Sequence, residues 1–202
     1  MKLSNGGIIA ISIFGFIFLI ILITLLTGIS TYNKLVSQEE NVNQSWANVQ
    51  NVYQRRADLI PNLVATVKGV ANFEQSTLTA VIEARAKATS VNINPKNLDE
   101  ASLQKFQSAQ DGLSTALSRL MVVVERYPEL KATQNFSELQ AQLEGTENRI
   151  TVERRNFNEA AQAYNSYLRS FPRNIIAGMF GFQKKAYFEA QKGAEVAPKV
   201  QF

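Results

Sequence analysis

Apolar residues follow two different patterns along this chain. They are continuous near the N-terminus, and beyond residue 41 they recur at alternating spacings of four and three residues. The second pattern places apolar side chains on one face of an α-helix, so each such stretch is predicted to pack against other helices. No window alternates with the period of a β-strand over a useful length. The chain is therefore predicted to be all-helical.

The continuous segment is "IIAISIFGFIFLIILITLLTGI", Ile8–Ile29, and no charge occurs from Leu3 to Asn33. At about 1.5 Å per residue, such a helix crosses a hydrocarbon core of roughly 30 Å. A cleaved signal peptide is the competing interpretation, because the small residues of "GIS" suit cleavage, although its apolar region is normally only about 7–15 residues long. We expect a retained single-pass anchor.

The periodic region divides into helices. Apolar stripes run from Val42 to Val70, from Leu103 to Tyr127 and from Phe136 to Leu168, and a further helix is predicted up to about Ser90. Three N-caps are predicted, at Asn72, Asn97 and Asn135, each followed three residues later by Glu or Gln. Pro128 and "FP" at 171–172 end the last two stripes. Long helices joined by short turns predict an antiparallel up-and-down four-helix bundle.

The predicted organisation has four parts. These are a short N-terminal segment (1–7), a transmembrane helix (8–30), a helical bundle (31–171) and an aromatic C-terminal tail (172–202). Lys2 precedes the anchor, whereas Lys34 follows it with Glu39 and Glu40 close behind. The positive-inside rule therefore favours, weakly, an N-terminus in the cytoplasm and a domain outside it.

Charged residues interrupt two of the apolar stripes. Arg56 occupies a core position on the first and Glu153 one on the last, and a buried charge is tolerated only when it is paired and hydrogen-bonded. We predict that Arg56 pairs with Glu147 or Glu153; a ligand site and a slightly rotated, solvated face are the alternatives. The predicted buried polar layer comprises Arg55, Arg56, Asp58, Glu147, Arg149 and Glu153.

A proline lies within the first stripe. Pro61 removes one backbone donor and clashes with the carbonyl of Ala57, so it is predicted to kink the helix or to mark a restart capped by Asp58.

The tail differs from the bundle in its glycine and aromatic content. "IIAGMFGF" is apolar and is flanked by Arg173, Lys184 and Lys185. One interpretation is a strap over the open end of the bundle, and the other is a contact surface for a second subunit or for lipid. The predicted assembly or membrane contacts are Ile175, Ile176, Met179, Phe180 and Phe182.

Composition argues against the usual catalytic groups. The chain has 202 residues with no Cys and no His, which excludes thiol nucleophiles, disulfides and the commonest general base and metal ligand. Phosphate-binding, zinc-protease and nucleophile-elbow motifs are also absent from the sequence. The net charge of +4 arises from interleaved acids and bases, so no nucleic-acid surface is predicted. We expect no cofactor, no metal and no enzymatic activity.

Several motifs resemble those of the LemA family. They are "RRADLIPNLVATVKGVA" (55–71), "ARAKA" (84–88), "ALSRLMVVVERYPELKA" (116–132), "LEGTENRITVERRNFNEA" (143–160), "YNSYLRSFP" (164–172) and "IIAGMFGFQKKAYFEA" (175–190). The resemblance implies a bacterial single-pass protein of the inner membrane with a four-helix bundle, and it implies no reaction. Family members are often encoded near membrane proteases and other envelope proteins.

Two functions are therefore expected from different classes. The first is a non-enzymatic scaffold that forms homo-oligomers in the lipid bilayer and organises envelope proteins or membrane shape. The second is an adaptor or regulatory subunit of one membrane enzyme, such as a protease; a hydrolase is a third and weaker hypothesis.

Overall fold

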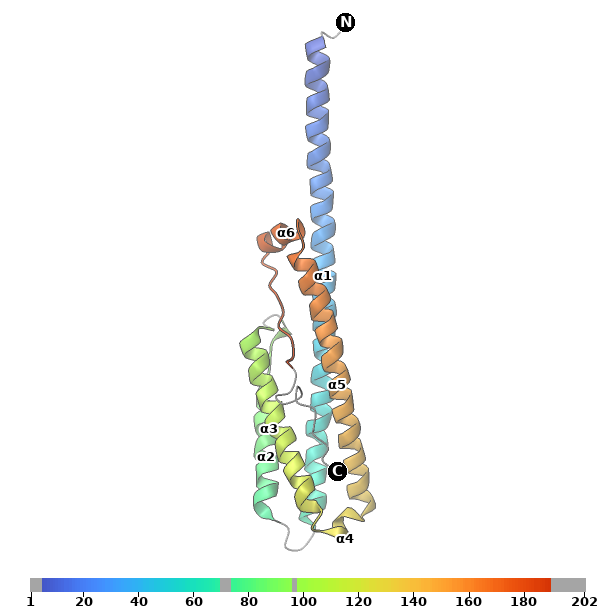
Figure 1. Cartoon of the computed structure of the whole chain (residues 1–202), viewed down its shortest axis with the longest axis vertical. Coiled ribbons are helices and arrows are strands. Elements are labelled where there is room, and N and C mark those ends of the chain that lie inside the picture. Colours follow the sequence, from blue (N-terminus) through green and yellow to red (C-terminus); the bar gives the residue numbers. More distant parts are fainter. Residues whose placement is uncertain (1–4, 70–73, 96–97, 190–202) are drawn as a thin grey trace, which may run out of the picture. The chain divides into compact units, whose positions relative to one another are not determined.

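The computed structural model describes residues 5–69, 74–95 and 98–189, and within these ranges it is all-helical, with no strand (Figure 1). The elements are α1 (Asn5–Lys68), α2 (Gln75–Ser90), α3 (Glu100–Val124), α4 (Pro128–Lys131), α5 (Gln134–Arg169) and α6 (Arg173–Met179). The prediction of an all-helical chain is confirmed.

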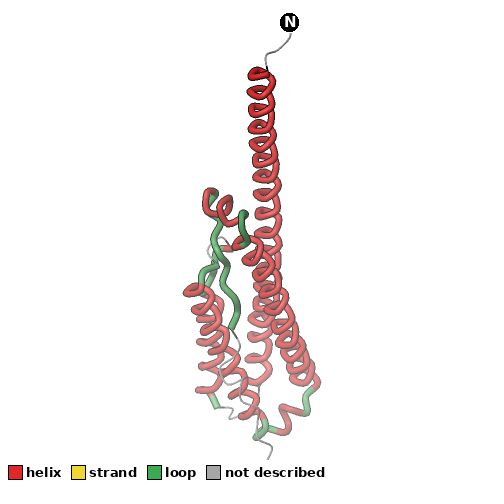
Figure 2. The backbone as a smooth tube through the Cα atoms, turned by 45° about the horizontal axis from the view of Figure 1, so that its top comes forward, coloured by secondary structure: helices red, strands yellow, loops and turns green. Residues whose placement is uncertain are grey.

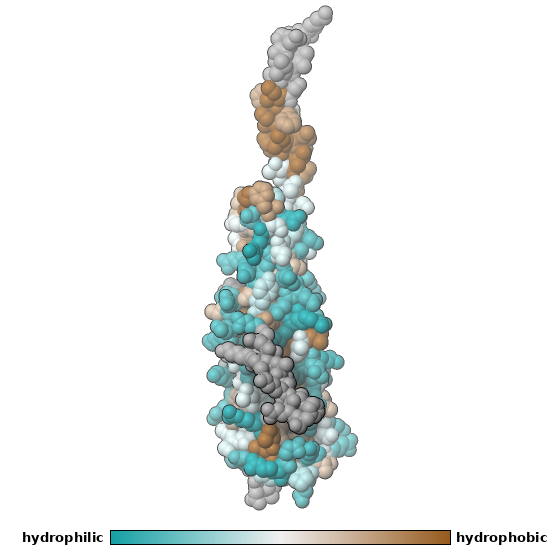
Figure 3. All heavy atoms as spheres, viewed as in Figure 1, coloured by the Kyte–Doolittle hydropathy of each residue, from teal (hydrophilic) through white to brown (hydrophobic). Residues whose placement is uncertain are grey.

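Helix α1 continues through Pro61 without interruption. A restart capped by Asp58 is therefore wrong, because the helix needs no new N-terminus there. Among the described residues, α1 is the one helix long and apolar enough to cross a membrane. Its apolar residues form the brown band of the N-terminal helix in Figure 3.

Two of the predicted caps lie elsewhere. Helix α3 is capped by Asp99, whose carboxylate accepts a hydrogen bond from Ser102 N at 2.7 Å. Helix α5 already begins at Gln134, so Asn135 lies inside it, and Thr133 Oγ1 accepts from Phe136 N at 3.4 Å. In both cases a residue close to the predicted asparagine can also cap a helix, and it does so in place of that asparagine. The predicted caps Asn72 and Asn97, like Val70, lie outside the described residues.

The chain divides into two compact units, which are described separately. The first comprises Met1–Asn41 and Gln162–Lys184, and the second comprises Val42–Ala161 and Lys185–Phe202. Helices α1, α2, α3 and α5 lie side by side in the second unit in both Figure 1 and Figure 2. A core cluster there draws on all of these helices, with members such as Leu63, Val81, Leu120 and Leu143.

An aromatic cluster forms part of the core of the second unit. Its members are Trp46, Tyr53, Phe106, Phe157 and Phe188. The Trp46 ring lies 5.2 Å from Phe106 and 5.7 Å from Phe157, mostly edge to face, an arrangement that aromatic pairs prefer. Phe188 comes from the C-terminal segment, so this part of the tail belongs to the core.

Residues 185–189 form an extended strap in the second unit. Asn158 both donates to Phe188 O at 3.0 Å and accepts from Phe188 N at 2.8 Å, as a neighbouring strand would. Arg154 Nη2 donates to Glu189 O at 2.7 Å, and its guanidinium covers the Phe188 ring at 4.7 Å. Side chains of α5 therefore satisfy backbone groups that an isolated segment would leave to water.

Helix α6 belongs to the first unit and ends at a tight turn. Gly181 has φ of +75°, and Phe182 N donates to Ala177 O at 3.0 Å. This combination is a Schellman motif, in which a left-handed residue lets the chain leave the helix with its last carbonyls bonded. The turn directs Phe182 to the ring of Tyr32, 5.7 Å away.

Candidate functional site

Arg56 lies at the centre of a polar layer in the second unit. Its side chain is 2% exposed, and its Nη1 donates to Glu147 Oε2 at 2.8 Å and to Ser114 Oγ at 2.9 Å. Its Nη2 donates to Gln110 Oε1 at 2.7 Å and, less closely, to Gln110 O at 3.3 Å. The guanidinium of α1 therefore finds acceptors on both α3 and α5.

Gln110 extends the layer to α2. While its Oε1 accepts from Arg56, its Nε2 donates to Ala88 O at 3.2 Å. Ala88 lies in the last turn of α2, where carbonyl groups have no partner within the helix. The buried amide of Gln110 thus accepts a hydrogen bond from the guanidinium of α1 and donates one to a C-terminal carbonyl of α2. The layer therefore connects α1, α2, α3 and α5.

A second arginine compensates for Pro61. Proline has no backbone N–H, so the carbonyl of Ala57, four residues earlier, loses its donor within α1. Arg85 of α2 supplies one: its Nε donates to Ala57 O at 2.7 Å. Pro61 therefore leaves a carbonyl of α1 without a donor, and a side chain of α2 supplies that donor. The proline thus favours the packing of α2 against α1 at this point.

The electrostatics of the layer are asymmetric. Arg56 is buried, whereas the Glu147 side chain is 47% exposed and remains partly hydrated. Arg56 also lies over the Tyr53 ring, with its Cζ 5.1 Å from the ring centroid. Burial raises the pKa of the Tyr53 phenol, although the nearby Arg154 and Arg56 oppose this shift.

The other predicted members of the layer lie elsewhere. Arg55, Asp58 and Arg149 are exposed, so their placement in a buried layer is wrong. A helical turn of about 100° per residue separates Arg55 from Arg56, so only one of these adjacent arginines can point inward. Glu153 is half-buried and accepts from Asn156 Nδ2 at 3.1 Å.

The two most informative polar partners were not predicted from the sequence. Gln110 stands on the apolar stripe of α3, and a polar residue at such a position is a signal for a buried amide. Arg85 lies within "ARAKA", and the donor lost at Pro61 showed that Ala57 needed a partner. The sequence pattern alone could not pair Arg85 with Ala57, because these residues are 28 positions apart in the chain.

The predicted contact residues of the tail divide into two groups in the first unit. Three of them are more than half exposed: Ile175, Met179 and Phe180. Ile176 and Phe182 are half-buried, and Ile176 Cδ1 lies 3.9 Å from the point where Gly28 would carry a Cβ. Phe180 adds a ring contact of 4.8 Å with Tyr32, although most of its surface stays exposed.

A tyrosine holds the segment after α6. Tyr164 OH donates to Gln183 O at 3.0 Å, within the first unit. Burial, and to a smaller extent the charge of Glu39, raises the pKa of Tyr164 well above its usual value. The phenol therefore stays protonated and keeps its donor role over the whole range in which proteins normally function.

The chemistry available at these sites is limited. Among the described residues, no group of three carboxylates is placed to hold a metal ion. A polar groove of about 600 Å³ runs along α3 in the second unit, lined by residues such as Gln104, Ser108, Asp111 and Tyr187. The charges of the buried layer are bonded to the protein itself.

The fold and the layer together define the class: an all-helical protein in which buried polar groups join helices, with one candidate membrane helix among the described residues. The LemA family model matches residues 45–202, and the chain belongs to this family. The chain is 25% identical to magnetosome protein MamQ 2 of Paramagnetospirillum magneticum, covering 96% of this chain and 77% of that protein. It is 24% identical to protein LemA of Metamycoplasma hominis, covering 79% and 69%.

Removing Glu147 is expected to destabilise the protein more than removing Arg56. Glu147→Met leaves a buried guanidinium without its counter-charge, which typically costs about 3–5 kcal/mol. Arg56→Met leaves mainly the buried amide of Gln110 short of a partner, at about 1–3 kcal/mol, because Glu147 can be hydrated. Denaturant unfolding of the full chain in detergent, followed by circular dichroism, measures both, with Glu147→Gln as the milder control. Equal losses, or a larger loss for Arg56→Met, would contradict the asymmetry.

Arg85 and Pro61 are expected to be energetically coupled. Arg85→Met leaves Ala57 O without a donor and should cost about 1–3 kcal/mol of unfolding free energy. In a Pro61→Ala background the backbone N–H is restored, so the same substitution should cost under about 1 kcal/mol. Arg126→Met, which removes an exposed ion pair with Glu74, serves as the uncoupled control in both backgrounds. An Arg85 cost that is the same in both backgrounds would refute the compensation.

Proposed function

We propose that this protein is a non-enzymatic, membrane-anchored helical scaffold that self-assembles and organises envelope proteins or membrane shape. The observation that carries the proposal is the use of the buried charges. In an active site, polar groups converge on a space that a substrate can enter. Here the guanidinium of Arg56 is enclosed, and its acceptors come from the helices around it.

The comparisons support a structural role. The alignment with the magnetosome protein covers 96% of this chain, so it includes the apolar helix as well as the helical unit. A name that refers to a cellular structure and not to a reaction favours a protein that builds or organises over one that catalyses. We extend that role to this chain as a proposal.

The finer architecture belongs to the same proposal. We infer that the helices of the second unit form an antiparallel up-and-down four-helix bundle, followed by the tail. We infer also that residues 8–30 cross the inner membrane of a bacterium once and that the bundle lies on the outer side. An anchor that confines chains to a plane favours self-assembly, because even weak contacts then benefit from a high effective concentration.

An adaptor for one membrane enzyme, such as a protease, is the second candidate. The polar groove along α3 favours it, since about 600 Å³ of lined space can receive a segment of a partner. The two candidates differ in stoichiometry. A scaffold binds copies of itself, whereas an adaptor needs only one copy for each partner.

Chains extracted from native membranes are expected to form a large homo-oligomer. Light scattering with subtraction of the detergent mass gives the protein mass, and co-purification of two differently tagged copies provides an independent check. A control in which the two tagged copies are mixed only after extraction distinguishes assembly in the membrane from association in detergent. A monomer that co-purifies with one other membrane protein would contradict the scaffold and support the adaptor.

A further inference from the structure

An apolar surface surrounds α6 in the first unit. Its four large side chains are all more than half exposed: Phe171 81%, Met179 76%, Phe180 61% and Ile175 54%. They lie within ten consecutive residues, whereas most large apolar side chains of a soluble surface occur singly. Something other than water is expected to cover them.

The position of α6 along α1 indicates what covers this surface. Ile176 Cδ1 lies 3.9 Å from the point where Gly28 would carry a Cβ, and Gly28 is in the last turn of the apolar segment 8–29. A Cβ at Gly28 would make ordinary van der Waals contact with this side chain. Because the same stretch of α1 reaches the edge of the hydrocarbon when it crosses a membrane, α6 lies at the depth of that edge. Figure 1 shows α6 beside α1 in this region.

The neighbouring aromatic residues fit the same depth. Tyr32 follows Gly28 by one helical turn, and its ring contacts Phe180 at 4.8 Å and Phe182 at 5.7 Å. Tyrosine is enriched where the bilayer meets water, since its ring is apolar and its hydroxyl polar. Three rings therefore gather where the anchor leaves the hydrocarbon.

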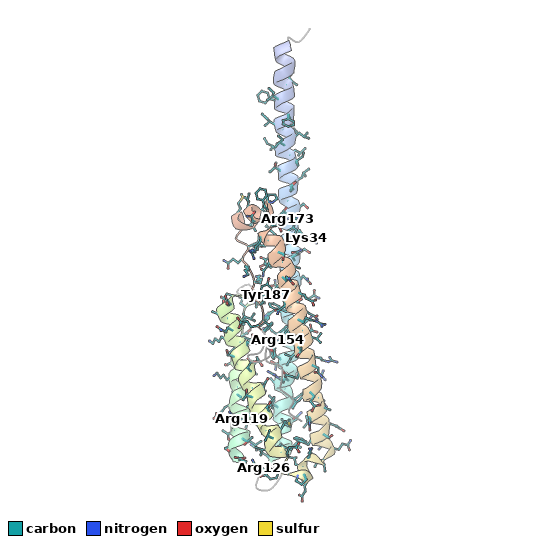
Figure 4. All side chains as sticks on the ribbon, in the orientation of Figure 1. Lys34, Arg119, Arg126, Arg154, Arg173 and Tyr187 are labelled. Carbon is teal, nitrogen blue, oxygen red and sulfur yellow. The ribbon has the colours of Figure 1, made fainter. Side chains whose placement is uncertain are left out.

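The charges of the segment that contains α6 are of one sign, although Glu39 and Glu40 of α1 also belong to the first unit. Residues 162–184 carry Arg169, Arg173 and Lys184 and no carboxylate, and Lys34 is the first charge after the anchor. Figure 4 labels Arg173, on α6, and Lys34, on α1. Long basic side chains next to an apolar surface can extend to lipid phosphates while their stems stay in the apolar region.

We propose that α6, with Phe171 and Phe180, is a second membrane contact of this chain, which lies in the interface of the leaflet that α1 leaves and prefers anionic phospholipid. The inference rests on the proposed crossing of the membrane by α1. The Gly181 turn then returns the chain from the lipid surface to Tyr164, whose hydroxyl binds Gln183 O. The two ends of the element are thereby fixed on the protein.

Spin labels on single cysteines test the proposal, since the chain has no cysteine of its own. The full chain is reconstituted into phosphatidylcholine vesicles with and without phosphatidylglycerol, and collisions with oxygen and with a water-soluble nickel chelate are measured. Met179→Cys reports on the proposed lipid face, and Asn174→Cys is the matched control on another face of α6. Ile20→Cys reports on the anchor, and Ser118→Cys reports on the exposed polar face of α3.

The label at Met179 is expected to show an oxygen-to-nickel collision ratio several-fold above that at Asn174, close to that at Ile20. Phosphatidylglycerol should raise this ratio, and Arg173→Gln should reduce the increase. If the label at Met179 is as accessible to nickel as the label at Ser118, the face lies in water and the proposal is overturned. Spin–spin broadening with few collisions of either kind would also overturn it, because the face would then contact a second copy of the chain. Lipid contact that is equal in both vesicles would overturn the preference for anionic lipid. Free nickel access at Ile20 would instead refute the membrane crossing itself.

Discussion

Arg56 is a charge that the protein cannot neutralise, because a guanidinium stays protonated in the interior. Its two terminal nitrogens find acceptors on the surrounding helices, whereas its buried Nε has no hydrogen-bond partner among the described residues. Ser114 and Gln110 require one rotation of α3, and Glu147 requires one rotation of α5. We infer that the hydrogen-bonded charge selects one rotation of each helix, where hydrophobic burial alone would tolerate several.

The proline adds a second constraint of the same kind. A buried carbonyl that has lost its own donor is also unfavourable, although less so than a buried charge that has no partner. Arg85 meets this demand from α2 at Ala57, one residue from Arg56. The guanidinium of Arg56 and the carbonyl of Ala57 thus find their hydrogen-bond partners on different helices. The interactions that make the packing specific therefore lie at one level of the second unit.

The parts of the fold that depend on periodicity were predictable. The stripe of α1 is buried from Val42 to Val67, and the interruption at Arg56 correctly indicated a buried charge. Caps were less predictable, because Asp99 and Thr133 stand within two residues of the asparagines chosen and can make the same bond. The tail was ambiguous for a different reason. Aromatic content does not reveal that Phe188 packs on Trp46 while Phe180 stays exposed, since this depends on the turn at Gly181 and on the amide of Asn158.

The membrane and the helical unit impose different demands on this chain. Apolar surface on the anchor and around α6 is stable only if lipid or another chain covers it, whereas the second unit covers its own core and holds the strap with side-chain bonds. The scaffold that we propose would use both properties, with the apolar helix in lipid and the polar surface of the second unit available to other proteins.

We infer that the polar layer joins four helices into one cooperative structure. Native-state hydrogen exchange, measured by mass spectrometry at increasing denaturant, tests it most directly. Amides flanking Arg56, Ala88, Gln110 and Glu147 are expected to share a single free energy of opening in the wild-type protein. An opening of α2 at distinctly lower free energy, with the other three helices still protected, would contradict it.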